Sequence, residues 1–138
     1  MIFTYMLDTN MVSYIVRGRS LVASARLLAL KRDEVACVSA ITEAEIRYGL
    51  SKKPEATTLK TLVDGFLASI QVLPWGRPEA EIYGQLRAKL EKAGMSLGNM
   101  DTMIAAHAIV TGAVLVTNDK AFAQVDDLTA SVNWATDL

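Results

Sequence analysis

Short apolar segments alternate with longer amphipathic segments along most of the chain. The short segments are rich in β-branched and aromatic residues, a composition typical of buried strands. The longer segments repeat apolar residues at helical spacing and carry capping residues or glycines near their ends. The predicted strands cover residues 2–7, 35–38, 71–73, 113–116 and 131–134. The predicted helices cover residues 10–17, 21–32, 40–51, 55–69, 78–93 and 100–111, followed by a helical turn at 120–122.

This alternation predicts an α/β fold with a mainly parallel sheet that is covered on both faces. The carboxyl ends of parallel strands meet at one edge of the sheet, where ligands bind. Asp8 follows the predicted strand at 2–7, and Asp119 follows the one at 113–116. We therefore expect these two carboxylates to lie at the same edge, although they are far apart in the sequence.

The composition indicates one domain and excludes several classes of protein. The 138 residues are 51% hydrophobic, which predicts a single domain over residues 1–138 with a substantial core. Cys37 is the single cysteine, so an intramolecular disulfide and a multi-cysteine zinc site are excluded, and a cytoplasmic location is expected. The first residues do not resemble a signal peptide, and no apolar run approaches the ~18 residues of a membrane helix.

The net charge of −1 argues weakly against a nucleic-acid partner, but the distribution of charge matters more than its sum. The chain has 15 acidic and 14 basic residues. If four of the acids share one metal-neutralised pocket, the other eleven face fourteen basic residues. A nearly neutral chain can therefore still present a cationic surface beside an acidic pocket.

Two candidate carboxylates follow strands, and each has an alternative explanation. Asp8 lies between an apolar strand and an apolar helix, where it could simply cap that helix. Asp119 follows Thr117 and Asn118, where a polar turn would explain it.

Two further candidates lie on helices. Glu45 shares a helical face with Ile41 and Tyr48, whereas Glu43 points elsewhere and is expected to form a surface pair. A solvated glutamate at the border of that face is the alternative for Glu45. Asp101 opens the helix at 100–111, where the helix dipole alone would favour an anion.

The conjunction of the four acids is harder to explain structurally than any one of them. Oxygen ligands suit Mg²⁺ or Mn²⁺, which can activate a water and stabilise charge on a phosphoryl group. The lone histidine, His107, cannot build a zinc site and is expected to be packed or hydrogen-bonded. Phosphate-binding loops of the GxxxxGK[ST] and GxGxxG types are absent.

Four ordered segments resemble the motifs of PIN-domain ribonucleases, specifically the VapC-type toxins of bacterial toxin–antitoxin pairs. These segments are Met6–Asn10, Ser39–Gly49, Gly98–Ala108 and Val116–Phe122. The resemblance covers nearly the whole chain. It departs from the family at Asn99-Met100, where a proline commonly precedes the acid, and this puts the turn before Asp101 in question.

The resemblance implies a three-layer α/β/α sandwich and a Mg²⁺- or Mn²⁺-dependent endoribonuclease that cleaves RNA, with tRNA a target class. It also implies a homodimer and a cognate VapB-type antitoxin that wraps the toxin and blocks the site with a basic side chain. The acidic positions of the family match Asp8, Glu45, Asp101 and Asp119, and its polar positions match Asn10 and Thr117.

Other assignments remain hypotheses. Arg87 could reach RNA phosphate or a site carboxylate, or it could be a solvated helix arginine, and Arg17 and Arg19 are weaker candidates for the same role. The apolar face of the helix at 55–69 could pack on the core or form a groove for the antitoxin. A nuclease acting on DNA or in RNA processing, and a catalytically silent binding module, are the alternatives to a toxin.

Overall fold

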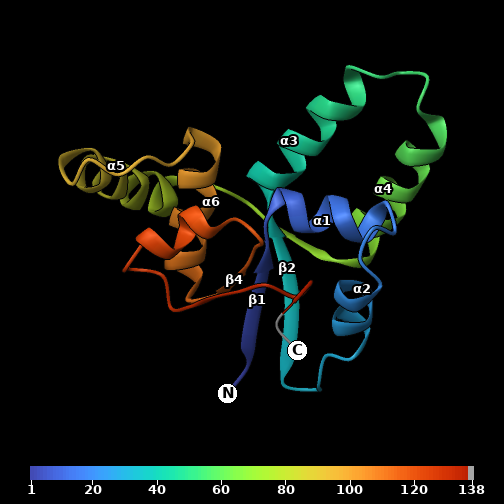
Figure 1. Cartoon of the computed structure of the whole chain (residues 1–138), viewed down its shortest axis with the longest axis horizontal. Coiled ribbons are helices and arrows are strands. Elements are labelled where there is room, and N and C mark those ends of the chain that lie inside the picture. Colours follow the sequence, from blue (N-terminus) through green and yellow to red (C-terminus); the bar gives the residue numbers. More distant parts are fainter. Residues whose placement is uncertain (137–138) are drawn as a thin grey trace.

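The computed structural model describes residues 1–136 and has a five-stranded parallel sheet at its centre (Figure 1). The strands are β1 (Phe3–Leu7), β2 (Glu34–Ser39), β3 (Gln71–Leu73), β4 (Val114–Val116) and β5 (Ser131–Val132), in the order β3-β2-β1-β4-β5. The α-helices are α1 (Thr9–Val16), α2 (Leu21–Leu28), α3 (Ala40–Ser51), α4 (Thr57–Ser69), α5 (Arg77–Lys92) and α6 (Asn99–Thr111), with the 3-10 helix η1 (Lys120–Gln124).

The helices cover both faces of the sheet, and this confirms the predicted three-layer α/β/α sandwich. Successive residues of a strand point to opposite faces. Met6 of β1 packs against α5 and α6, whereas Leu7 packs against α1, α2 and α4. In β2, Cys37 likewise faces the α5–α6 side with Met6, and Val38 faces the α1–α4 side with Leu7. The strands therefore need continuous apolar runs, because each supplies both cores.

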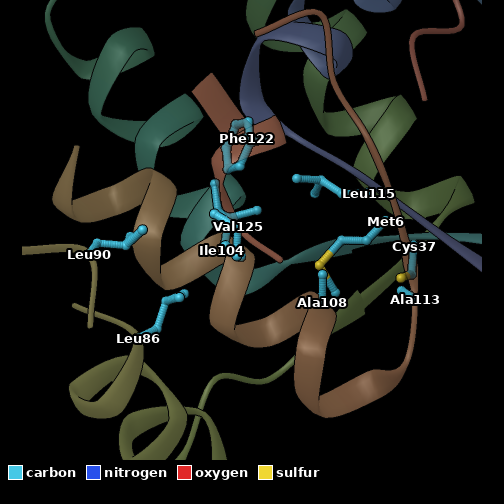
Figure 2. Close-up of a cluster of buried hydrophobic side chains, with 11 residues drawn as sticks. Met6, Cys37, Leu86, Leu90, Ile104, Ala108, Ala113, Leu115, Phe122 and Val125 are labelled. Carbon is cyan, nitrogen blue, oxygen red and sulfur yellow. The ribbon is translucent and has the colours of Figure 1, made fainter. Parts of the chain in front are cut away.

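The core on the α5–α6 face contains the larger aliphatic side chains of both helices (Figure 2). Leu86 and Leu90 of α5 and Ile104 of α6 lie with Phe122 of η1. Cys37 is buried in this core, and burial raises the pKa of its thiol to about 11. Cys37 is therefore packed as a small apolar side chain of the core.

Some of the predicted boundaries differ from the structure by two to four residues. The helix predicted over 21–32 ends at Leu28, because the chain turns to enter β2: the Lys31 N–H donates to the Glu34 carboxylate at 2.9 Å. The helix predicted over 55–69 begins at Thr57. The strand predicted over 131–134 ends at Val132, because Asn133 starts a turn in which its Oδ1 accepts the Ala135 N–H at 2.9 Å.

The last described segment closes the core on the α1–α4 face. Trp134 is buried at 1% exposure, and its ring lies 5.4 Å from that of Tyr5. The Arg26 guanidinium lies 5.3 Å from the Trp134 ring and 5.4 Å from the Tyr5 ring, and it pairs with Glu34. Among residues 1–136, no helix is long and apolar enough to cross a membrane.

Candidate active site at the carboxyl edge of the sheet

Asp8 follows β1 at the carboxyl edge of the sheet and is 3% exposed. Its Oδ1 accepts the Met11 N–H at 2.8 Å, so it caps α1, and its Oδ2 accepts the Thr117 hydroxyl at 2.5 Å. The pKa of Asp8 is raised to about 6, chiefly by burial and to a smaller extent by repulsion from Asp101 and Asp119, whereas both hydrogen bonds lower it. Capping and an unusual electrostatic environment therefore coexist at this residue.

Thr117 and Asp119 follow β4 at the same edge, because β1 and β4 pair in parallel. The Thr117 hydroxyl oxygen accepts the Asp119 N–H at 3.0 Å, and the Asp119 carboxylate accepts the Ala121 N–H at 2.9 Å. Thr117 thus connects Asp8 to Asp119. Asp119 also caps the short helix η1, so the polar-turn interpretation describes its backbone correctly.

Asp101 lies in the first turn of α6 and is half-buried. Burial raises the pKa of its carboxyl, and repulsion from Glu45 and from Asp119 adds to this rise. The helix begins at Asn99 without the proline common in the family, since the Gly98 carbonyl accepts the Thr102 N–H and hydroxyl, both at 2.8 Å. The departure at Asn99-Met100 therefore leaves the start of the helix intact.

Glu45 lies on α3, and its Oε1 accepts the Thr9 hydroxyl at 2.6 Å. Glu43 instead pairs with Arg47 at 3.2 Å, which is the predicted surface pair. Tyr48, on the same helical face as Glu45 by spacing, is 65% exposed, because α3 contacts α1 and α4 through other residues.

Thr9, which holds Glu45, was missed as a site residue. The signal was its place directly after Asp8, where the chain turns from β1 into α1 across the edge of the sheet. Thr42, one turn before Glu45 on α3, is 0% exposed, and its hydroxyl lies 3.5 Å from that of Thr9. Threonines at helix starts and helix faces are common, so their position beside an acid was visible only in the fold.

The fold gathers the four acids at one edge, since each influences at least one other electrostatically. Among residues 1–136, no three Asp, Glu, His or Cys side chains form a preassembled coordination shell. Mg²⁺ keeps several waters and needs only one or two carboxylates from a protein. An all-oxygen acid set with raised pKa values at Asp8 and Asp101 fits such a hydrated cation.

A hollow of about 300 Å³ lies between α1, α3 and α4, and of the four acids only Glu45 lines it. Asn10 is exposed on α1 and also lines it. Arg17 also lines this hollow, whereas Arg19 does not. Leu59 and Val63 of α4 line it too, so the apolar face of α4 contributes to both the core and the hollow. The polar and charged residues of the lining are Thr9, Asn10, Ser13, Arg17, Glu45, Lys52 and Lys53.

Two other candidates lie apart from the acids. Arg87 is exposed on α5, where its Nε donates to Glu91 at 3.0 Å and its Nη1 donates to the Tyr83 hydroxyl at 2.9 Å. It pairs with neither Asp8 nor any other site carboxylate, so only the RNA contact remains a prediction for it. His107 is buried, and its Nδ1 lies 2.7 Å from the Ser39 Oγ.

The sequence and the fold have known relatives that extend over nearly the whole chain. The PIN domain family model matches residues 5–128. Ribonuclease VapC2 of Rickettsia felis is 34% identical over 131 residues, which cover 94% of this chain and 97% of the relative. The tRNA(fMet)-specific endonuclease VapC of Shigella flexneri is 33% identical over 115 residues, which cover 83% of this chain and 86% of the relative.

Solved structures agree with the sequence relatives. A chain in the crystal structure of VapBC2 from Rickettsia felis, bound to a DNA fragment from the promoter, matches with a TM-score of 0.89 and 32% identity, over 96% of this chain and 99% of that one. A chain of DNA-bound VapBC from Salmonella typhimurium matches with a TM-score of 0.87 and 30% identity, over the same shares. The chain therefore belongs to the PIN-domain family and, within it, to the VapC ribonucleases.

Proposed function

We propose that the protein is a toxin endoribonuclease that cleaves RNA with the help of a Mg²⁺ or Mn²⁺ ion at the acid site. The observation that carries this proposal is the state of Asp8, a carboxyl that is 3% exposed with its pKa raised to about 6. A buried carboxylate that other carboxylates repel destabilises the fold unless a cation offsets the repulsion. A carboxylate that destabilises the folded state in this way indicates a functional role for Asp8.

Asp8, Glu45, Asp101 and Asp119 would hold the ion, directly or through water. When bound, the ion supplies a water of lowered pKa and stabilises negative charge on the scissile phosphate. The protein's own hydrogen bonds orient the acids for this task. Two donors fix both oxygens of Asp8, and Thr9 fixes one oxygen of Glu45, so the remaining lone pairs point in defined directions.

The deciding experiment compares cleavage of total RNA in Mg²⁺ by the wild-type protein and by Asp101→Asn. We expect the variant to lose cleavage while it remains folded, since the amide replaces a carboxylate in a half-buried, repelled position. Asp126→Asn is the matched control, because Asp126 is an exposed acid outside the site. Equal cleavage by wild type and Asp101→Asn would reject the acid site.

The substrate class follows from the relatives. The Shigella flexneri relative is named a tRNA(fMet)-specific endonuclease, and we propose tRNA as the target class here. Incubation with initiator tRNA and with an elongator tRNA separates a specific nuclease from a general one. Cleavage of duplex DNA in place of RNA would favour the DNA-directed alternative, and failure of the wild type to bind Mn²⁺ would favour a silent binding module.

We also propose a VapB-type antitoxin as the partner and a homodimer as the assembly, since the similar solved chains come from VapBC complexes. Co-expression with the antitoxin should relieve growth arrest caused by the toxin, and Asp101→Asn alone should cause none. Light scattering of the isolated toxin measures the oligomeric state, and a monomer mass at all concentrations would contradict the dimer.

A further inference from the structure

His107 forms a buried polar contact between α6 and the junction of β2 with α3, and the proposed chemistry does not use this contact. It lies in the middle of α6 at 2% exposure, and its Nδ1 is 2.7 Å from the Oγ of Ser39, which is 0% exposed. Burying an imidazole and a hydroxyl is unfavourable unless they satisfy each other. The two groups therefore satisfy each other's hydrogen-bonding needs within the core.

The bonds around Ser39 suit one assignment of donor and acceptor in this contact. Ser39 ends β2 and caps α3, and its Oγ accepts the Ile41 N–H at 3.1 Å. Its own hydroxyl proton can then be donated to the Nδ1 of His107, which places the imidazole proton on Nε2. Burial lowers the pKa of His107, against an opposing influence of Glu79, and this favours the neutral ring that such an acceptor requires.

The two helices joined by this bond each carry one of the site acids. Ser39 precedes α3, which carries Glu45, and His107 lies on α6, which carries Asp101. Glu45 and Asp101 carry like charges and are close enough to interact electrostatically. A bond between the helices resists this repulsion before a cation arrives.

The near neighbours of His107 on α6 are small side chains. Ala105, Ala106 and Ala108, the near neighbours of His107, are all fully buried. Such small side chains allow close approach but interlock little. A hydrogen bond has narrow limits of distance and angle, so it defines the rotation of α6 against the edge of the sheet.

We propose that His107 is a positioning residue, whose bond to Ser39 keeps Asp101 and Glu45 at a separation that suits one divalent cation. This inference rests on the proposed metal-dependent function of the same site. His107 does not touch the substrate or the cation in this proposal, and it acts only through the placement of the two helices.

The test compares His107→Leu with His107→Asn, whose side chain can still bond to Ser39. Calorimetric titration of Mn²⁺ without RNA and steady-state cleavage of RNA are measured for each. We expect His107→Leu to weaken Mn²⁺ binding and to lower kcat by about tenfold or more, with little change in KM, as for other residues that orient metal ligands. His107→Asn should retain most of the wild-type Mn²⁺ affinity and most of the wild-type kcat. Ile104→Val, a core change in the same helix, is the matched control and should alter neither.

Ser39→Ala and the double variant Ser39→Ala/His107→Leu complete a thermodynamic cycle. If the bond is the cause, the double variant binds Mn²⁺ no more weakly than Ser39→Ala alone. Long-range ¹H–¹⁵N NMR of the imidazole provides a reading that needs neither RNA nor metal. The wild type should show a proton on Nε2, and Ser39→Ala should lose this single-tautomer signature.

Unchanged Mn²⁺ affinity in folded His107→Leu, additive losses in the double variant, or an equal loss in Ile104→Val would each overturn the proposal. If His107→Leu does not fold, Ser39→Ala and His107→Asn still decide it. Wild-type protein that cleaves no RNA would reject the proposed function, whereas wild-type cleavage with an unaffected His107→Leu would reject only this inference.

Discussion

Replacing Asp8 by asparagine should stabilise the metal-free protein at neutral pH. The amide has the shape of the carboxylate, and its Oδ1 can still accept the Met11 N–H that Asp8 now accepts at 2.8 Å. The charge repelled by Asp101 and Asp119 disappears. The one loss is at Thr117, whose hydroxyl no longer has the carboxylate acceptor at 2.5 Å.

The magnitude follows from the pKa of Asp8, which the fold raises from 3.8 to about 6. This rise corresponds to about 3 kcal/mol by which the ionised carboxylate destabilises the folded state. The hydrogen bond lost at Thr117 costs about 1 kcal/mol. We therefore expect Asp8→Asn to raise the free energy of unfolding by about 2 kcal/mol at pH 7.5.

The pH dependence has a definite sign. Below about pH 4, Asp8 is protonated in both the folded and the unfolded states, so it contributes no pH dependence there. Between pH 4 and about 6 the unfolded chain ionises first, and the wild type loses stability as the pH rises. Above about pH 6, the loss in the free energy of unfolding caused by ionised Asp8 is constant. The advantage of Asp8→Asn should thus grow from pH 4 to 6 and then level off.

Urea unfolding in EDTA, followed by tryptophan fluorescence from pH 4 to 7.5, measures this difference, with Asp126→Asn as the exposed control. Saturating Mn²⁺ should then reverse the order, because a ligand at 100 times its Kd adds about 2.7 kcal/mol to the wild type alone. A variant less stable than the wild type at pH 7.5, or an advantage that does not change with pH, would refute the reasoning.

Three further predictions concern residues around the site and the core. Thr9→Val removes the 2.6 Å hydrogen bond to Glu45, so RNA cleavage should fall by about tenfold while the urea midpoint changes little; unchanged kcat would contradict the orienting role. Arg87→Ala should lower RNA affinity and reduce the salt slope of binding by about 1 if Arg87 contacts phosphate, and an unchanged slope in fluorescence anisotropy would reject that contact. Arg26→Leu removes the guanidinium 5.3 Å from Trp134, and urea unfolding should show a loss of about 1–2 kcal/mol, with cleavage by the folded variant preserved.

The sheet and its acids could be predicted because the sequence pattern of a buried parallel strand is direct. The apolar runs ending at Asp8 and Asp119 required only that both strands run in the same direction. Strand direction alone therefore predicted that the Asp8 and Asp119 carboxylates lie at one edge of the sheet. The distinction between Glu45 and Glu43 also followed from helical spacing, and the Glu43–Arg47 pair at 3.2 Å agrees with it.

Contacts between elements could not be predicted in the same way. The bond from His107 to Ser39 joins residues 68 positions apart, and nothing local in either segment specifies it. The exposure of Tyr48 could not be predicted, because helical spacing defines a face on an isolated helix but does not show which neighbouring elements cover that face. The end of α2 at Leu28 depended on a hydrogen bond to Glu34, which lies in the next element.

The central place of β1 in the sheet has a consequence for how the protein is made. β1 lies between β2 and β4, so β1 is synthesised well before β4, the strand that completes its pairing. The hydrogen bond from Thr117 to Asp8 likewise forms only after the intervening segment has been translated, since the two residues are 109 positions apart. A nascent or truncated chain that ends before residue 117 holds Asp8, Glu45 and Asp101 without the residue that fixes Asp8. Synthesis interrupted before residue 117 should therefore release inactive fragments, and the assembled site should exist only in chains that extend past Asp119.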